Sequence, residues 1–145
     1  MAAEPATAAG EPVDEPRSVE VRVAAEPAQL SVMRAVVGDL AMRADFDVDS
    51  IADLRLAVDE VCSSLVRLAT ASASLVCRFR TEDDGLSLQA EVTSKDPSGP
   101  RTGTFSWRVL SALADSVAPS VESAGDDTGT YVVRIDLRKG RTVHE

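Results

Sequence analysis

Aromatic residues, cysteine and histidine are scarce in this chain of 145 residues. Three phenylalanines, one tyrosine and one tryptophan are present, so we expect a core built mainly from Val, Leu and Ala. The single histidine, His144, excludes a Ser-His-Asp triad and a metal cluster of His and Cys ligands. Cys62 and Cys77 lie in periodic apolar segments and are predicted to be small buried residues of a cytosolic protein, with a redox pair as the alternative.

The sequence also lacks a phosphate-binding glycine motif, a long apolar run and an excess of positive charge. Neither a P-loop nor a G-x-G-x-x-G pattern occurs, and no run is long enough to cross a bilayer. The net charge of −9 argues against direct contact with nucleic acid and favours a partner with a basic surface. We therefore expect a cytoplasmic protein that contacts neither membrane nor nucleic acid.

The length and the local composition predict one folded domain with a short extension at each end. Residues 1–17 are rich in Ala, Pro and Glu, do not resemble a signal peptide, and are predicted to form a disordered arm. The domain is expected over residues 18–138, followed by a tail over residues 139–145.

The most informative segment runs from Ser50 to Ala69 and has the periodicity of an amphipathic helix. Ser50 is its expected N-cap. The apolar stripe consists of Ile51, Leu54, Val58, Val61, Leu65 and Leu68. The opposite face carries Asp53, Leu56, Glu60, Ser64 and Arg67. This polar face either lines a cleft or is a solvated helix surface, and the segment alone leaves both open.

The remaining elements predict an α/β (α+β) two-layer sandwich, with helices on one face of a mixed sheet of four to five strands. A loop over residues 94–104 precedes the last predicted helix, and is either a phosphate cradle or an ordinary connection. Pro119 is expected to end that helix. The predicted helices are residues 27–43, 50–69 and 106–118, and the predicted strands are residues 18–24, 74–81, 86–93, 120–123 and 130–137.

Three segments, LRLAVDE, FSWRVLSALADSV and GTYVVRI, resemble motifs of the GHKL (Bergerat-fold) ATPase family, which has the histidine-kinase-like ATPase fold. The resemblance covers about residues 18–137 and is strongest to the RsbW-like anti-sigma factors, which are also serine-protein kinases. It implies that Glu60 is the catalytic glutamate and that Ser64 replaces the asparagine that helps to hold magnesium. It also implies that Arg34, on the first helix, contacts a protein partner.

The glycine-rich boxes of that family match less well. The aspartate that reads adenine falls on Ser94, or on Asp96 if the loop shifts by two residues, and the glycine after it becomes Gly99. The lid motif and the closing strand map to further nucleotide-contacting positions, which are Gly103, Ser106, Gly129 and Thr130. Since a magnesium ligand and the adenine reader are both altered, we expect ATP or ADP and Mg²⁺ to bind weakly.

The resemblance implies two functions. The first is an anti-sigma factor that sequesters an alternative sigma factor of the stress or sporulation type and is countered by an anti-anti-sigma (STAS-domain) protein. The second is an active serine-protein kinase that phosphorylates that partner with Mg-ATP. The resemblance also implies a homodimer. An acidic interaction module of unrelated ancestry is the third alternative.

Overall fold

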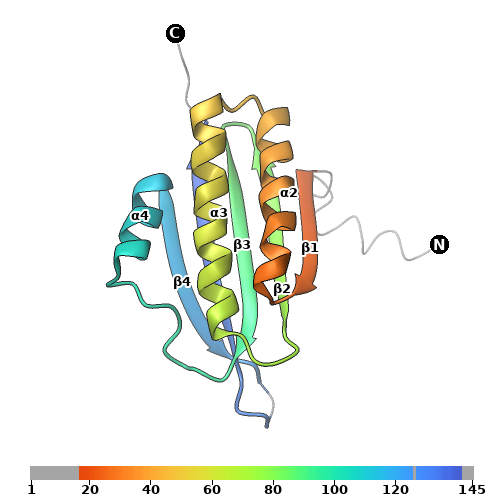
Figure 1. Ribbon diagram of the computed structural model, residues 1–145, viewed down its shortest axis with the longest axis vertical. Coiled ribbons are helices and arrows are strands. Elements are labelled where there is room, and N and C mark those ends of the chain that lie inside the picture. The colour runs from red at the N-terminus through yellow and green to blue at the C-terminus, as the bar shows by residue number, and fades with distance from the viewer. Residues whose placement is uncertain (1–16, 126, 142–145) are drawn as a thin grey trace, which may run out of the picture.

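A computed structural model describes residues 17–125 and 127–141, in which three α-helices and a short 3-10 helix accompany five strands. Figure 1 shows a sheet whose one face is covered by the helices. In chain order the elements are β1 Ser18–Ala24, η2 Pro27–Gln29, α2 Leu30–Arg43, α3 Val48–Leu68, β2 Ser74–Glu82, β3 Gly85–Ser94, α4 Phe105–Leu113, β4 Ser116–Ser123 and β5 Tyr131–Gly140.

The strands lie in the order β1-β2-β3-β5-β4, and every neighbouring pair is antiparallel. The α+β two-layer class predicted from the sequence is confirmed, but the expectation of a mixed sheet was wrong. The connections explain the difference. Helices α2 and α3 cross the sheet in opposite directions, so the chain returns to the end where β1 finished and β2 runs back against it (Figure 1). Helix α4 and strand β4 do the same between β3 and β5.

The core lies between the helices and the sheet and is mainly aliphatic. Val58 and Leu65 of α3 are completely buried, and Leu113 of α4 packs against the same cluster, as the periodicity predicted. Phe46 and Phe79 are the aromatic residues buried in the described part of the chain. None of the described helices combines the length and apolar character needed to cross a bilayer.

Helix α3 begins earlier than predicted because Asp47, and not Ser50, is its N-cap. The Asp47 carboxylate accepts a hydrogen bond from the Ser50 amide at 2.7 Å, which satisfies one of the unpaired N–H groups of the first turn. Asp and Ser are nearly equivalent at an N-cap, so the sequence did not discriminate between them.

Helix α4 ends at Leu113, five residues before the predicted end at Ala118. The Lys139 ammonium donates a hydrogen bond to the Leu113 carbonyl at 2.9 Å, and Asp115 N–H donates to the Arg138 carbonyl, so β5 draws the chain into the sheet. Strand β4 therefore starts at Ser116 and contains Pro119. Proline is tolerated there because β4 is an edge strand, where outward N–H groups have no partner strand.

The face of the sheet away from the helices carries a polar row across four strands. Arg78 donates hydrogen bonds to Glu20 on β1 and to Gln89 on β3, and Gln89 donates to Asp136 on β5. These residues are directly opposite one another in the strand register. The alternation along each strand thus places apolar side chains toward the helices and a hydrogen-bonded set of charges on the open face.

Candidate functional site

A hollow of about 530 Å³ lies between α3, the loop that follows β3, and the N-terminal turn of α4. It brings together five of the residues predicted from the sequence: Glu60, Ser64, Asp96, Gly99 and Ser106. Residues that the prediction did not assign also line it, which are Arg67, Leu68, Ser98, Pro100, Arg101, Thr104, Trp107 and Leu110. The polar face of α3 is therefore a cleft wall at this end of the helix.

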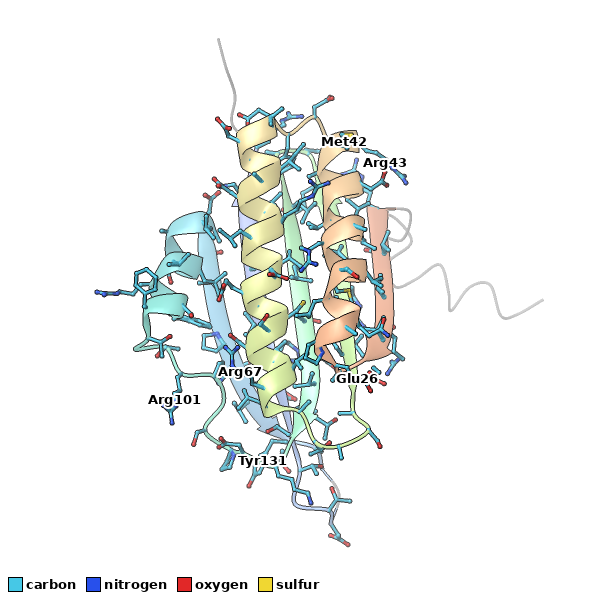
Figure 2. All side chains as sticks on the ribbon, viewed as in Figure 1. Glu26, Met42, Arg43, Arg67, Arg101 and Tyr131 are labelled. Atoms are coloured by element: carbon cyan, nitrogen blue, oxygen red, sulfur yellow. The ribbon has the colours of Figure 1, made fainter. Side chains whose placement is uncertain are left out.

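Helix α3 presents Glu60, Ser64 and Arg67 to the hollow, and each of these residues lies about one helical turn from the next. The Arg67 guanidinium lies 3.5 Å from the Ser64 hydroxyl, to which Nη2 donates. Figure 2 shows Arg67 near the C-terminal end of α3 and Arg101 on the loop that borders the hollow. A cation beside Ser64 disfavours a metal ion at that hydroxyl and favours an anionic group nearby.

The loop after β3 is held in shape by hydrogen bonds between side chains and its own backbone. The Ser94 hydroxyl accepts from the Asp96 amide at 3.0 Å, and the Asp96 carboxylate accepts from the Ser98 amide at 2.8 Å. Ser94 is completely buried and does not line the hollow, whereas Asp96 is exposed and does. Of the two positions left open by the sequence, Asp96 is thus the one that faces this site.

Gly99 has a structural reason to be glycine. Its φ is +73°, a region that side chains disfavour, and a Cβ there would lie 2.7 Å from Val121 Cγ2 of β4. Gly103 differs, because a Cβ at that position would meet nothing within 4 Å, and it does not line the hollow. The loop therefore needs a glycine at position 99 to pack closely against β4.

Helix α4 directs its first turn at the hollow. The Thr104 hydroxyl caps the helix by accepting from the Trp107 amide at 3.1 Å. Ser106 and Trp107 line the site, while Phe105 is 75% exposed. Sequence periodicity placed Trp107 in the core. It does pack against the core, but it also forms part of the cleft wall.

A second hollow, of about 880 Å³, adjoins the first and shares Arg67, Leu68 and Asp96 with it. Ser94 and Thr130 line this second hollow. Gly129 is exposed, has a φ of +73°, and does not line either one. Seven of the predicted nucleotide-contacting residues are therefore distributed over two neighbouring hollows, while Gly103 and Gly129 line neither.

Arg34 lies outside both hollows, on α2, where its guanidinium forms an ion pair with Asp59 of α3. The Arg34 side chain is 43% exposed and that of Asp59 is 32% exposed. The pair lies at the interface between the two helices. Further along the same interface, Arg55 of α3 covers Gly38 of α2. Sequence analysis predicted Arg34 as a partner contact but missed the carboxylate that holds it.

The first hollow is lined by charged groups of both signs. Arg67, Arg101 and the N-terminal turn of α4 offer positive charge, whereas Glu60 and Asp96 offer carboxylates. No group of three or more His, Cys, Asp or Glu side chains able to hold a metal occurs in the described residues. A magnesium ion would then be held mostly by the phosphates of a nucleotide and by Glu60, since Ser64 lies beside a guanidinium.

Comparison with known proteins identifies the class. The family described as the histidine kinase-like ATPase domain matches residues 23–135, most of the chain. The chain therefore belongs to the histidine kinase-like ATPase family. Within it, the chain is 38% identical over 125 residues to the anti-sigma-F factor RsbW of Mycobacterium tuberculosis, in both strains compared, covering 86% of this chain and 74% of the relative. The resemblance inferred from the motifs is confirmed.

A solved structure supports the fold. The crystal structure of the RsbU and RsbW domains of Rv1364c from Mycobacterium tuberculosis superposes with a TM-score of 0.56 at 17% identity. The match covers 88% of this chain and 34% of that one, so this chain spans about a third of the length of the solved chain. At this identity the likeness establishes a common fold.

Proposed function

We propose that this chain is an anti-sigma factor that binds an alternative RNA polymerase sigma factor and keeps it from the polymerase. The observation that carries the proposal is the 38% identity to an anti-sigma-F factor RsbW over 86% of the chain. Binding of this kind needs a complementary surface and no chemical step. The net charge of −9 supplies electrostatic attraction to a basic partner surface.

The exposed side of the α2–α3 interface supports the proposal of a protein contact. Arg34 uses Nη1 for Asp59, and a guanidinium carries five N–H donors, so others can reach an acidic group of a partner. Leu56 of α3, three residues before Asp59 on the same helix, is 46% exposed and adds apolar area. A partner that covered Arg34 would keep its existing ion pair, which lowers the cost of desolvating the guanidinium.

The proposal extends to the partners that such a protein requires. A STAS-domain anti-anti-sigma protein would release the sigma factor by competing for the chain, and the chain itself would act as a homodimer. Sedimentation at several concentrations tests the dimer separately from sigma binding, because each can fail without the other.

Direct binding tests the main proposal. The full chain is mixed with purified sigma factors of its host, one at a time, and the heat of binding is measured with and without nucleotide. We expect one alternative sigma factor to bind with a Kd of about 1 μM or tighter without nucleotide, and the housekeeping sigma factor to serve as the matched control. Absence of binding across all alternative sigma factors would refute the proposal.

An active serine-protein kinase is the second candidate, and the retention of Glu60 in a hollow with Arg67 and Trp107 favours it. Nucleotide would lie with its phosphates toward Arg67 and the first turn of α4, while Glu60 would orient the attacking serine hydroxyl of the partner. When bound, Mg-ATP would supply the phosphoryl group. Because Ser64 adjoins Arg67 and Asp96 is used in the loop, we propose weak nucleotide binding and slow transfer.

A further inference from the structure

The two cysteines of the chain are in contact, although they belong to different elements and lie 15 residues apart. Cys62 is on α3 and Cys77 is on β2, and their Sγ atoms are 3.7 Å apart. Both are free thiols and both are completely buried. The sequence predicted their burial, but it could not show that the folded chain pairs them.

The two sulfur atoms are in contact but must come closer to form a bond. A disulfide needs a separation of about 2.05 Å, so the Sγ atoms must approach by about 1.7 Å. Cys77 lies opposite Val21 on one side and Ala90 on the other. A rotation of the two side chains together with a small shift of α3 toward the sheet would bring the sulfur atoms within bonding distance.

We propose that Cys62 and Cys77 are an oxidative modification site, at which a reversible intramolecular disulfide joins the middle of α3 to the central part of the sheet. The proposal stands on this geometry and does not depend on the anti-sigma function. Its consequence reaches the candidate site, since Cys62 lies between Glu60 and Ser64 on the same helix. The bond would fix the segment of α3 that forms one wall of the hollow.

The chemistry requires a two-electron oxidant, for which we name a peroxide. One cysteine thiol releases its proton, its thiolate attacks a peroxide oxygen and the O–O bond breaks. A sulfenic acid and a hydroxide form, and the hydroxide takes up the released proton to become water. The second sulfur then attacks the sulfenic sulfur, the S–S bond forms, and the hydroxyl leaves as a second water. Two thiols and one hydrogen peroxide thus give one disulfide and two waters.

The closed fold protects the thiols from this reaction. The hydrogen bond with Cys77, and then burial, raise the pKa of the Cys62 thiol well above its usual value, which disfavours the nucleophilic thiolate. Oxidation should therefore proceed from transiently opened molecules in which α3 has moved off the sheet. Its rate should rise with urea well below the unfolding transition, and the bond, once made, should be reduced slowly.

The test uses the full chain, treated with hydrogen peroxide with and without low urea. We expect the intact mass to fall by about 2 Da, both thiols to resist alkylation after denaturation, and dithiothreitol to restore both. Hydrogen exchange in α3 should slow in the oxidised form, and its melting temperature should rise above that of the reduced form. Cys62→Ala and Cys77→Ala are the matched controls, because each removes one partner and leaves the other thiol.

Four results would overturn the proposal. Mass gains of about 16 Da per added oxygen without loss of 2 Da would show that the sulfurs oxidise separately. Intermolecular dimers through cysteine would show that the buried contact does not direct the pairing. An oxidised form that loses its native circular dichroism, or in which exchange of α3 is unchanged, would show that the bond does not fit the fold or does not fix the helix.

Discussion

Arg34 of α2 and Asp59 of α3 form an ion pair in which Nη1 and Oδ1 are 2.5 Å apart. The pair joins the two helices, and both side chains are partly exposed. It fixes the position of a guanidinium at the surface that we propose for partner binding. The energy of such a pair in water is small, so its main effect is on geometry.

Charge reversal at Arg34 tests that surface. Arg34→Glu should weaken sigma factor binding by more than tenfold, about 1.4 kcal/mol, because it places like charge against Asp59 and removes the donors offered to the partner. The dissociation constant is measured by calorimetry, with circular dichroism to verify the fold. Asp59→Asn is the control: it removes the ion pair but leaves Arg34, so it should weaken binding much less. Equal losses in the two variants would assign Arg34 a structural role only.

Truncation of Leu65 tests the core. Leu65 is completely buried, so Leu65→Ala should lower the free energy of unfolding by about 2–5 kcal/mol through lost burial and a residual cavity. Leu56→Ala, on the same helix but at a position that is 46% exposed, should cost less than about 1 kcal/mol. Urea denaturation measures both. A loss below 1 kcal/mol at Leu65 would contradict the packing described.

Gly99→Ala tests the contact between the loop after β3 and strand β4. The substitution forces a side chain into a backbone with φ of +73° and against Val121, so we expect a loss of about 1–3 kcal/mol in unfolding free energy. Gly103→Ala, where the added Cβ meets nothing, should change stability by less than about 0.5 kcal/mol. Adding Val121→Ala to Gly99→Ala should recover the steric part. If the two alanine variants behave alike, the loop does not depend on Gly99.

The pH dependence of stability tests the environment of Cys62. Its pKa in the folded state is raised, whereas the unfolded thiol titrates near pH 8.5. The unfolded chain therefore releases this proton first, and the free energy of unfolding should fall as pH rises above about 8.5, by at most about 1.4 kcal/mol per pH unit. Below that pH the contribution is fully present. With a reductant throughout, Cys62→Ala should show a shallower decline, and identical slopes would refute the assignment.

Ser64→Asn tests the nucleotide site. An amide oxygen reaches further from the helix than the Ser64 hydroxyl, so we expect ATP to bind more tightly in the presence of magnesium and unchanged in its absence. Calorimetry with and without the ion measures this, and Ser63→Asn, whose residue does not line the hollow, is the control. Phosphoryl transfer by the unmodified chain at about 1 per second or faster would instead favour the kinase. Ser94→Asp is expected to destabilise the fold, because Ser94 is completely buried.

The sequence predicted the elements whose pattern depends on their own residues and failed where distant contacts decide. The stripe containing Val58 and Leu65 predicted the buried face of α3. The end of α4 could not be predicted, because it depends on Lys139 and Arg138 from β5. Local propensity favoured helix through Ala118, and pairing with the sheet overrode it.

The site was predicted in part for a similar reason. Helical spacing alone predicts that Glu60, Ser64 and Arg67 share one face of the helix. That Arg67 lies against Ser64, or that Ser94 turns inward, depends on side-chain hydrogen bonds that no spacing encodes. Trp107 shows the same limit, since one side chain packs on the core and lines the hollow as well.

The polar row on the open face of the sheet has a consequence for strand alignment. Strands β3 and β5 are not joined by a tight turn, because α4 and β4 intervene, so no loop fixes how far one slides along the other. A slip of two residues keeps every apolar side chain on the core face, and burial alone therefore does not forbid it. Such a slip in either direction separates Glu91 from Arg134, its ion-pair partner, and in one direction it also places Glu91 opposite Asp136. The exposed charges thus select one strand register from those that the hydrophobic pattern permits.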